Sequence, residues 1–259
     1  MITCKELAQQ VKDNVKKQVA EMATKPSLAI VTVGDDPASA SYVKGKIKDC
    51  HEVGIVPHHV KLAEDITQEE LNDMMWSLRL HTGIILQLPI PKHLDADKAL
   101  EMINIYQDVD GLKPGSKHIP CTARGVFEWL KANDLVAGKH IVIINRSKLV
   151  GRPLAKLLLD ADATVTVCHS KTNELHKILY DTDVVVMAVG KPNFINSNDV
   201  LMGTVVVDVG INKVDGKLCG DYGNSILDEV YNIYVTPVPG GVGLLTRAYL
   251  LQNVVEYTW

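Results

Sequence analysis

The sequence predicts an α/β protein built from two units, each with a parallel sheet between layers of helices. The chain has 259 residues, which is enough for about two domains. Short β-branched or aliphatic runs alternate with helical patterns along it, as in parallel sheets that are covered by helices. A glycine- and proline-rich patch at 111–120 interrupts this alternation near the middle of the chain and marks the expected boundary.

The first unit is expected to begin with an amphipathic helix, because apolar residues recur every three or four positions from Leu7 to Met22. The segments after this helix alternate between runs with strand character and runs with helical spacing. We expect strands at 28–33, 59–62 and 83–88, and helices at 38–53, 67–80 and 96–103.

The second unit repeats this alternation after residue 120. Pro153 falls in the first turn of one expected helix, where its missing amide hydrogen is tolerated. We expect strands at 140–144, 164–167, 184–188, 205–209 and 234–236, and helices at 122–132, 151–160, 173–180 and 242–256.

The composition, with 46% hydrophobic and 22% charged residues, is typical of a soluble globular protein. A net charge of −4 and only 5% aromatic residues argue against a nucleic-acid-binding surface. No apolar stretch approaches 18 residues, so we expect no membrane span, and the nine histidines show no metal-ligand spacing, so we assign no metal. The five cysteines are odd in number and form no Cys-x-x-Cys pair, which favours reduced thiols in a cytoplasmic protein.

The expected helix at 38–53 carries a polar stripe beside its apolar stripe. Ser39, Tyr42 and Lys46 are spaced at i, i+3 and i+7, so their side chains project together. A tyrosine and a lysine side by side can stack on a ring and transfer a proton. The same spacing also fits a solvated helix edge, and the stripe alone does not separate these two interpretations.

Three further segments hold candidate ligand-binding residues. Gln87 ends an apolar strand, where open α/β sheets bind ligands, although a satisfied structural amide is the other interpretation. Asp110, in the run Asp-Val-Asp-Gly, is either a ligand anchor or part of an Asp-Gly turn. Pro239 and Gly240 lie in the run TPVPGGVG, which suits the close approach of a planar ligand or a tight turn before a helix.

The segment at 140–151 has the pattern of strand, loop and helix start, which is where a dinucleotide pyrophosphate meets helix amides. The usual G-x-G-x-x-G spacing is missing. Gly151 remains, and Asn145 stands where a first glycine would be expected. Asparagine tolerates positive φ better than most residues, so the tight turn is still expected here.

The next expected strand is followed by Ser170, with no acidic residue beside it to bind the ribose hydroxyls, and Arg146 lies in the preceding loop. This combination suits the 2′-phosphate of NADP, and ordinary polar loop residues are the other interpretation.

Taken together, these segments resemble the bifunctional methylenetetrahydrofolate dehydrogenase/methenyltetrahydrofolate cyclohydrolase family. The matching pieces fall in the order of the family and cover nearly the whole chain, so the set is far more specific than any single piece. They are ASASYVKGKIKDCHEVGI (38–55), GIILQLPIP (83–91), DVDGL (108–112), PCTARG (120–125), RSKLVGRPLAKLLL (146–159), ATVTVCHSKT (163–172), AVGKPNFI (188–195), VVDVGIN (206–212) and TPVPGGVG (236–243).

The resemblance implies two linked reactions. Methylenetetrahydrofolate gives a hydride to NADP and becomes methenyltetrahydrofolate, and water then opens the methenyl bridge to give 10-formyltetrahydrofolate. The resemblance also implies a folate domain over 1–115 on which a C-terminal helix at 242–259 packs, and a Rossmann-like NADP-binding domain over 116–241. A cleft between these domains and a homodimer formed through the Rossmann unit are expected as well.

The family pattern further implies roles for individual residues. Tyr42 stacks on the folate, Lys46 is the general acid and base, Gln87 hydrogen-bonds to Lys46, and Asp110 anchors the pterin edge. The positions expected to bind the folate are Ser39, Tyr42, Asp110, Pro239 and Gly240, and those expected to bind NADP are Asn145, Arg146, Ser147, Ser170 and Ile211.

Two other functions stay open at this point. The segment 112–119 is shorter than the stretch usual in the family, which is compatible with a non-catalytic folate-binding protein. The other alternative is a single-activity dehydrogenase, either one that uses NAD or one that lacks efficient cyclohydrolase activity. Arg146 and Ser170 favour NADP, and the presence of Tyr42 and Lys46 favours an enzyme.

Overall fold

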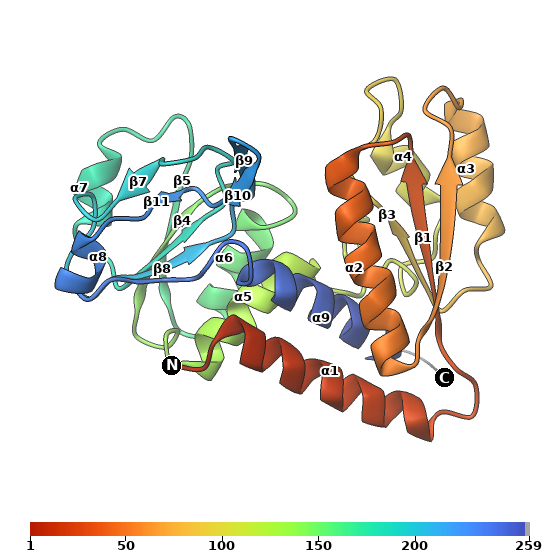
Figure 1. Ribbon diagram of the computed structural model, residues 1–259, viewed down its shortest axis with the longest axis horizontal. Helices are drawn as coiled ribbons and strands as arrows, with labels where there is room; N and C mark the ends of the chain where they lie inside the picture. Colours follow the sequence, from red (N-terminus) through yellow and green to blue (C-terminus); the bar gives the residue numbers. More distant parts are fainter. Residues whose placement is uncertain (257–259) are drawn as a thin grey trace. The chain divides into compact units, whose positions relative to one another are not determined.

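The computed structural model describes residues 1–256, apart from the side chains of Pro37 and Ala38. The last three residues of the helix expected at 242–259 therefore lie outside the described residues. Two helices, α1 (Cys4–Glu21) and α9 (Val242–Glu256), are the first and last elements of the chain (Figure 1).

The chain divides into two compact units, and α1 and α9 each contribute to both of them. Unit 1 comprises Met1–Ala8 and Thr122–Thr246. Unit 2 comprises Gln9–Cys121 and the chain from Arg247 onward.

A parallel sheet with the strand order β2-β1-β3 forms the centre of unit 2 (Figure 1). Its central strand is buried on both faces, which is why its sequence is a continuous apolar run instead of an alternating one. The strands are β1 (Ser27–Val33), β2 (Val56–Leu62) and β3 (Gly83–Leu86).

Helices cover both faces of this sheet. Leu28 and Ile30 of β1 point into a core that they share with α1, α2 and α9. Ala29 and Val31 point to the opposite face, into a core shared with α3 and α4. The three helices not yet introduced are α2 (Pro37–Val53), α3 (Gln68–Ser77) and α4 (Ala96–Glu101).

Both ends of α2 are fixed by local interactions. The carboxylate of Asp36 accepts a hydrogen bond from the backbone amide of Ser39 at 2.7 Å, which caps the first turn. At the other end Gly54 adopts a left-handed conformation with φ of 88°, as is common just after a helix. The helix starts at Pro37, two residues before Ser39, and carries Ser39, Tyr42 and Lys46.

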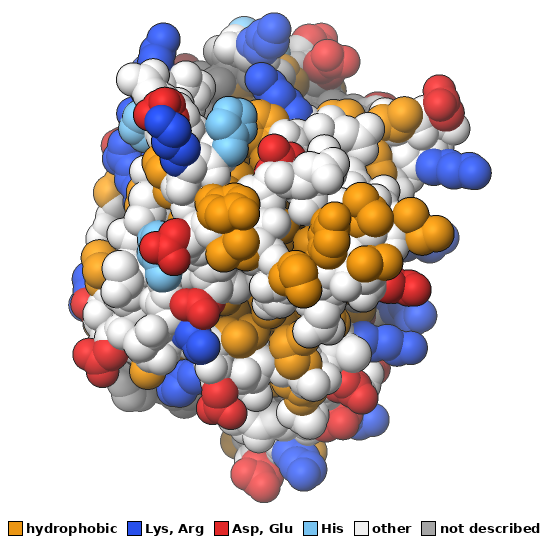
Figure 2. All heavy atoms as spheres, turned by 90° about the vertical axis from the view of Figure 1, so that its left-hand side faces the viewer, with side chains coloured by type: hydrophobic (Ala, Val, Ile, Leu, Met, Phe, Trp, Pro, Cys, Tyr) orange, Lys and Arg blue, Asp and Glu red, His pale blue; other side chains and the backbone are white. Residues whose placement is uncertain are grey.

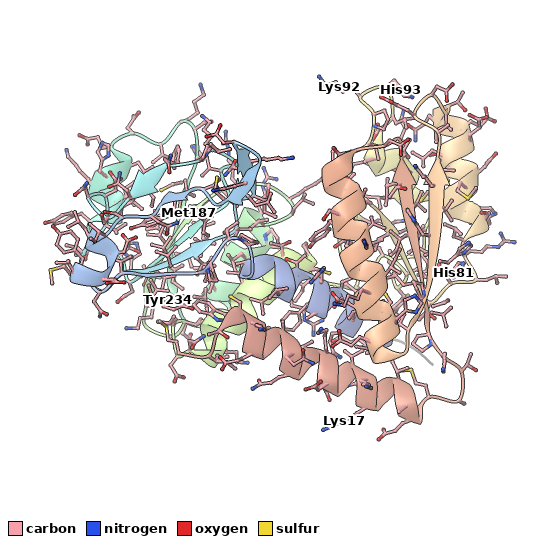
Figure 3. The ribbon with its side chains drawn as sticks, in the orientation of Figure 1. Lys17, His81, Lys92, His93, Met187 and Tyr234 are labelled. Atoms are coloured by element: carbon pink, nitrogen blue, oxygen red, sulfur yellow. The ribbon has the colours of Figure 1, made fainter. Side chains whose placement is uncertain are left out.

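A second parallel sheet, with the strand order β12-β8-β6-β4-β5, forms the centre of unit 1. Tyr234 of β12 stacks on Trp129 of α5 with ring centroids 5.9 Å apart, and Figure 3 labels Tyr234 together with Met187 at the end of β6. The strands are β4 (His140–Ile144), β5 (Thr164–Cys168), β6 (Val184–Met187), β8 (Val205–Asp208) and β12 (Tyr234–Val235), and the helices are α5 (Cys121–Ala132), α6 (Gly151–Leu159), α7 (Leu175–Leu179) and α8 (Leu227–Val230).

The strand order of this sheet reverses at β4. From β4 the chain passes to β5 on one side and then returns to β6 on the other side. Such a reversal is the switch point at which doubly wound sheets bind ligands, beyond the carboxyl ends of the strands. The predicted α/β class with a Rossmann-like unit is thereby confirmed.

Several short elements of unit 1 have no counterpart in the sequence prediction. β9 (Asn212–Val214) and β10 (Lys217–Cys219) form an antiparallel hairpin, and β7 (Ile195–Asn196) pairs with β11 (Tyr222–Gly223). Strands of two or three residues are too short to show a hydrophobic period. The hairpin did carry a usable signal, because the Asp-Gly turn at 215–216 has positive φ at both residues.

The described part of the chain holds no helix that is both long enough and apolar enough to span a membrane. Among the same residues, no group of three or more His, Cys, Asp or Glu side chains is arranged to hold a metal ion.

Candidate active site

Lys46 lies in the interior of unit 2 and is only 3% exposed. Its Nζ donates a hydrogen bond to Oε1 of Gln87 at 3.0 Å. The same Nζ lies 5.1 Å from the ring centroid of Tyr42, one helical turn earlier on α2. The structure thus brings together three of the predicted site residues, and the solvated-edge interpretation of the α2 stripe is wrong for Lys46.

Gln87 follows β3 directly, and both ends of its side-chain amide have partners. Its backbone amide donates to the carbonyl of Val31 at 2.8 Å, which extends the sheet pairing by one residue. Its Nε2 donates to the carbonyl of Leu88 at 2.7 Å, so Oε1 faces Lys46. Gln87 is therefore a satisfied amide whose acceptor oxygen fixes the position of the lysine ammonium.

The two acids of the Asp-Val-Asp-Gly run have different environments. Asp108 is fully buried, accepts from the backbone amide of Lys113 at 2.7 Å, and has a pKa raised by desolvation. Asp110 remains partly exposed. Asp108 forms a parallel bridge with Ile84 of β3, the strand that leads to Gln87, and Asp110 lies two residues further along the chain. Asp108 supports the loop, and contact of Asp110 with a ligand stays a prediction.

The shortened segment 112–119 folds back onto Gly111. Gly111 has φ of 74°, and a Cβ at this position would lie 2.6 Å from the backbone nitrogen of Pro120. A side chain is excluded on both grounds. The Asp-Gly turn interpretation therefore holds for Gly111 itself.

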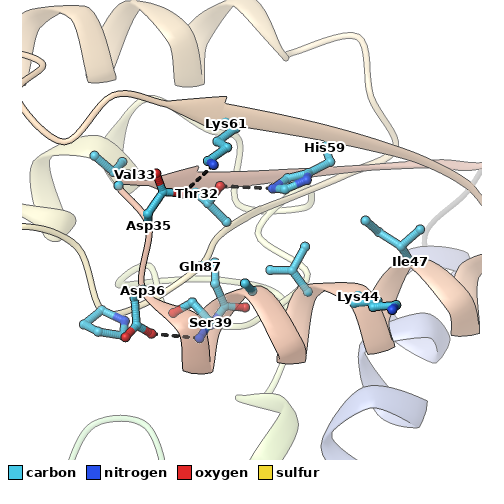
Figure 4. A pocket seen from close by; sticks show the side chains of 14 residues that line it. Thr32, Val33, Asp35, Asp36, Ser39, Lys44, Ile47, His59, Lys61 and Gln87 are labelled. Atoms are coloured by element: carbon cyan, nitrogen blue, oxygen red, sulfur yellow. Dashed lines mark hydrogen bonds and ion pairs between the residues drawn. The ribbon is translucent and has the colours of Figure 1, made fainter.

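A pocket of about 220 Å³ lies between α2 and the ends of β1 and β2, and Ser39 and Gln87 are among its lining residues (Figure 4). His59 is hydrogen-bonded through Nε2 to Oγ1 of Thr32 at 3.0 Å, and Lys61 forms an ion pair with Asp35. Burial and the nearby lysine lower the pKa of His59. The lining is mainly apolar and carries charges of both signs, and it includes two predicted site residues, Ser39 and Gln87.

Pro239 and Gly240 belong to unit 1, in the exposed loop that precedes α9. Gly240 has φ of 101°, and a Cβ on the next residue, Gly241, would lie 2.3 Å from the carbonyl oxygen of Pro237. The glycine pair is thus required by the backbone of the turn. Contact of Pro239 and Gly240 with a folate stays a prediction.

Asn145 is the first residue after β4, at the switch point of the unit 1 sheet. Its Oδ1 accepts from the backbone amides of Ser147 at 2.8 Å and Gly151 at 3.0 Å, and its Nδ2 donates to the carbonyl of Ala188 at 2.6 Å. The expectation that Asn145 replaces a glycine by adopting positive φ is wrong, because its φ is not positive. Asparagine serves here through its side-chain hydrogen bonds.

The remaining predicted cofactor residues lie beyond the carboxyl ends of the strands of this sheet. Ile144 and Cys168 are paired across β4 and β5, so Arg146 and Ser170 each follow their strand by two residues. Both residues are exposed, as is Ile211 after β8. The pairing of neighbouring strands brings Arg146 and Ser170 to one edge, as recognition of a 2′-phosphate requires.

Family models match both parts of the chain. Residues 2–110 match the tetrahydrofolate dehydrogenase/cyclohydrolase catalytic domain, and residues 120–258 match the NAD(P)-binding domain of the same family. The chain belongs to this family. The family expected from the sequence is confirmed, and the shortened segment 112–119 falls between the two matched domains.

Relatives of this dehydrogenase/cyclohydrolase family match nearly the full chain. The bifunctional protein FolD of Clostridium novyi is 43% identical, over 97% of this chain and 96% of its own length. The crystal structure of the bifunctional enzyme FolD from Campylobacter jejuni has a TM-score of 0.91 and 41% identity, over 98% of this chain and 96% of its own. The Trypanosoma brucei enzyme, complexed with NADP cofactor and inhibitor, has a TM-score of 0.89 and 32% identity, over 98% and 95% of the two chains.

The sequence analysis missed two buried acids of this family member. Asp221 is fully buried, and its carboxylate accepts from the backbone amides of Val189, Gly190 and Lys191 at 2.5–3.0 Å. Asp208, also buried, accepts from the amide of Asp221 at 3.0 Å, and desolvation raises its pKa. These acids hold the loop after β6. An acid at the end of an apolar run was the only signal available.

Proposed function

We propose that the chain oxidises 5,10-methylenetetrahydrofolate with NADP and then hydrolyses the methenyl product to 10-formyltetrahydrofolate. The observation that carries this proposal is the contact of the buried Lys46 with Gln87, beside the Tyr42 ring. The catalytic and NAD(P)-binding family domains on one chain support it. We assign the folate to residues 1–115 and to the end of the chain, and NADP to residues 116–241.

Lys46 supplies the proton transfer that ring opening needs. Water that attacks the methenyl carbon must lose a proton, and the ring nitrogen released from that carbon must gain one. An amine held at a fixed place can serve both steps, and the 3.0 Å hydrogen bond to Gln87 fixes Nζ of Lys46. Tyr42, next to this amine, offers a ring on which the planar substrate stacks.

The residues at the edge of the unit 1 sheet fit NADP. Arg146 and Ser170 offer a cation and a hydroxyl at the ends of paired strands, and no acid there repels a 2′-phosphate. The bound cofactor would supply the hydride acceptor. The contribution of the protein is to hold the nicotinamide ring and the one-carbon unit of the folate next to each other.

Replacement of Arg146 by alanine is expected to weaken NADP binding by about 10–100-fold, because a charge-assisted hydrogen bond to the 2′-phosphate is lost. Binding of NAD, which lacks that phosphate, should change less than threefold. Dissociation constants for both cofactors, measured by calorimetry, check this expectation. Equal losses for NADP and NAD would contradict the assignment of Arg146 to the 2′-phosphate.

A two-cofactor assay tests the proposed function as a whole. Purified protein receives methylenetetrahydrofolate with NADP or with NAD, and the methenyl intermediate and the 10-formyl product are followed by their absorbance. The proposal expects both products with NADP. A strong NAD preference without 10-formyl product would favour a single-activity dehydrogenase, and binding of folate without turnover would favour a non-catalytic protein.

We further propose that the chain forms a homodimer through unit 1. The strand β5 ends the sheet order, so one of its edges has no partner strand in that sheet. Val167 on β5 and Leu159 on α6 are 39% and 58% exposed. Further apolar side chains gather on the side of unit 1 that carries α7 and α8, at the left of Figure 1 (Figure 2). An open apolar edge of this kind suits a second copy of the chain.

Substitution of Val167 by lysine should convert the dimer to a monomer, because two lysines would meet across the two-fold axis of the interface. Light scattering coupled to size exclusion measures the mass. Val56→Lys, at a valine that is 49% exposed on the edge strand β2 of unit 2, is the matched control and should stay dimeric. A dimer that persists in Val167→Lys would place the interface elsewhere.

The cysteines agree with a reducing compartment. All five are present as thiols, four of them buried. Burial raises the pKa of Cys4 and Cys50 to about 12, which keeps these thiols protonated and unreactive. We therefore place the enzyme in the cytoplasm, where its 10-formyl product would serve purine biosynthesis.

A further inference from the structure

The loop after β4 is organised around Arg146. Asn145 accepts a hydrogen bond from the amide of Ser147, two residues on, so the backbone of Arg146 lies inside a closed Asx turn. The same Oδ1 accepts from the amide of Gly151 at the start of α6. One side-chain oxygen thus ties the residues on both sides of Arg146 to the helix that follows.

The other end of the Asn145 side chain reaches the neighbouring loop. Its Nδ2 donates to the carbonyl of Ala188 at 2.6 Å, 43 residues away and directly after β6. β4 and β6 are the two strands between which the strand order reverses. Asn145 therefore bridges the switch point itself, where the cofactor is expected to bind.

The loop that receives this bridge is rigidly held from its far side. The amides of Val189, Gly190 and Lys191 all donate to the buried carboxylate of Asp221. Asp221 also accepts from Nδ2 of Asn212 at 2.8 Å, and its own amide donates to Asp208. The carbonyl of Ala188 is therefore held in place, and the hydrogen bonds of Asn145 to Ala188 and Ser147 hold the Arg146 turn in place relative to it.

We infer that Asn145 is a positioning residue that holds Arg146 in place and thereby determines the preference for NADP over NAD. The inference rests on the proposed function, in which Arg146 meets the 2′-phosphate. Hydrogen bonds from Asn145 to both loops replace the glycine-rich turn that this sequence lacks. Removal of the side chain leaves the Arg146 backbone free to move, and a displaced guanidinium loses its contact with the phosphate.

A double-mutant cycle on cofactor binding tests the inference. Asn145→Ala, Arg146→Ala and the double variant are compared with the wild-type chain for their dissociation constants toward NADP and NAD. Asn145→Ala should lower the NADP-to-NAD preference by about tenfold. In the Arg146→Ala background it should change that preference less than twofold, because the group it positions is gone.

Two further variants separate positioning from general damage. Asn196→Ala removes a similar turn, in which Oδ1 accepts from the amide of Asn198 two residues on, and should leave the cofactor preference unchanged. Asn145→Asp keeps an acceptor for Ser147 and Gly151 but cannot donate to the carbonyl of Ala188, so it keeps the turn and loses the bridge. Its NADP-to-NAD preference should fall, by less than in Asn145→Ala. Asn145→Asp also covers the case in which Asn145→Ala folds poorly.

The outcomes distinguish the inference from the proposed function. If Arg146→Ala lowers the NADP preference but Asn145→Ala leaves it within twofold of wild type, the positioning role is wrong and the function stands. If Arg146→Ala itself leaves the preference unchanged, the assumed 2′-phosphate contact fails first. Equal losses of NADP and NAD binding in both Asn145→Ala and Asn145→Asp would also overturn the inference, because both variants lose the bridge to Ala188.

Discussion

Replacing Lys46 by alanine should lower the rate of methenyl ring opening by about 10²–10⁴-fold, the usual contribution of a general acid or base. Lys46 contacts both Gln87 and the Tyr42 ring. The rate of hydrolysis of added methenyltetrahydrofolate, without NADP, measures this step alone.

The control for Lys46 must separate lost chemistry from lost packing, because the side chain is buried. Lys46→Met keeps most of the volume and should be as slow as Lys46→Ala. Lys48→Ala removes an exposed lysine from the same helix and should retain full activity. Near-normal ring opening by Lys46→Met would remove Lys46 from the mechanism.

Replacing Gly151 by alanine should abolish measurable NADP binding and lower the unfolding midpoint of the protein. A Cβ at this position would lie 2.0 Å from the carbonyl oxygen of Asn145 and 2.9 Å from the backbone nitrogen of Arg146. Both neighbours are backbone atoms, so the loop between β4 and α6 has to move. Since this loop also carries Ser147, the whole proposed cofactor edge would be displaced.

Calorimetric titration with NADP and thermal unfolding together check the Gly151 prediction. Gly243→Ala is the matched control for stability, because a Cβ there meets nothing within 4 Å and the residue lies in α9. Gly243 is the second residue of α9, and alanine has the higher helix propensity, so the midpoint of this control should not fall. Tight NADP binding by Gly151→Ala would show that the loop tolerates the displacement.

The sequence predicted the long elements well because each of them shows a hydrophobic period or a continuous apolar run. β2 was only half found, since it is an exposed edge strand whose residues Val56–Leu62 include Pro57 and two histidines. Its polar side chains hide the strand pattern, although its backbone pairs with β1 along the full length. A single sequence reveals which residues are buried, through their hydrophobic pattern, but it does not reveal which backbones pair.

The site residues show the same difference between local patterns, which the sequence reveals, and long-range partners, which it does not. The Tyr42 and Lys46 spacing is local to one helix and was visible in the sequence. The partner of Lys46, Gln87, lies 41 residues away and was identified as such only through the family resemblance. Asn145 was predicted on the wrong ground, positive φ. Its actual partner is the backbone carbonyl of Ala188, and a residue of any type supplies such a carbonyl, so the sequence does not reveal the contact. Asp221 was missed since backbone amides make up most of its partners.

The sharing of α1 and α9 between the units has a consequence for biosynthesis. Leu250, Leu251 and Val254 of α9 complete the core of the unit that contains β1, so this core stays open until those residues have been synthesised. Conversely, the backbone of Ile2 accepts from Trp129 and donates to Asn133, so Ile2 is synthesised long before these partners. A single cut between residues 121 and 122 would therefore separate β1 from the core side chains of α9, and Ile2 from Trp129.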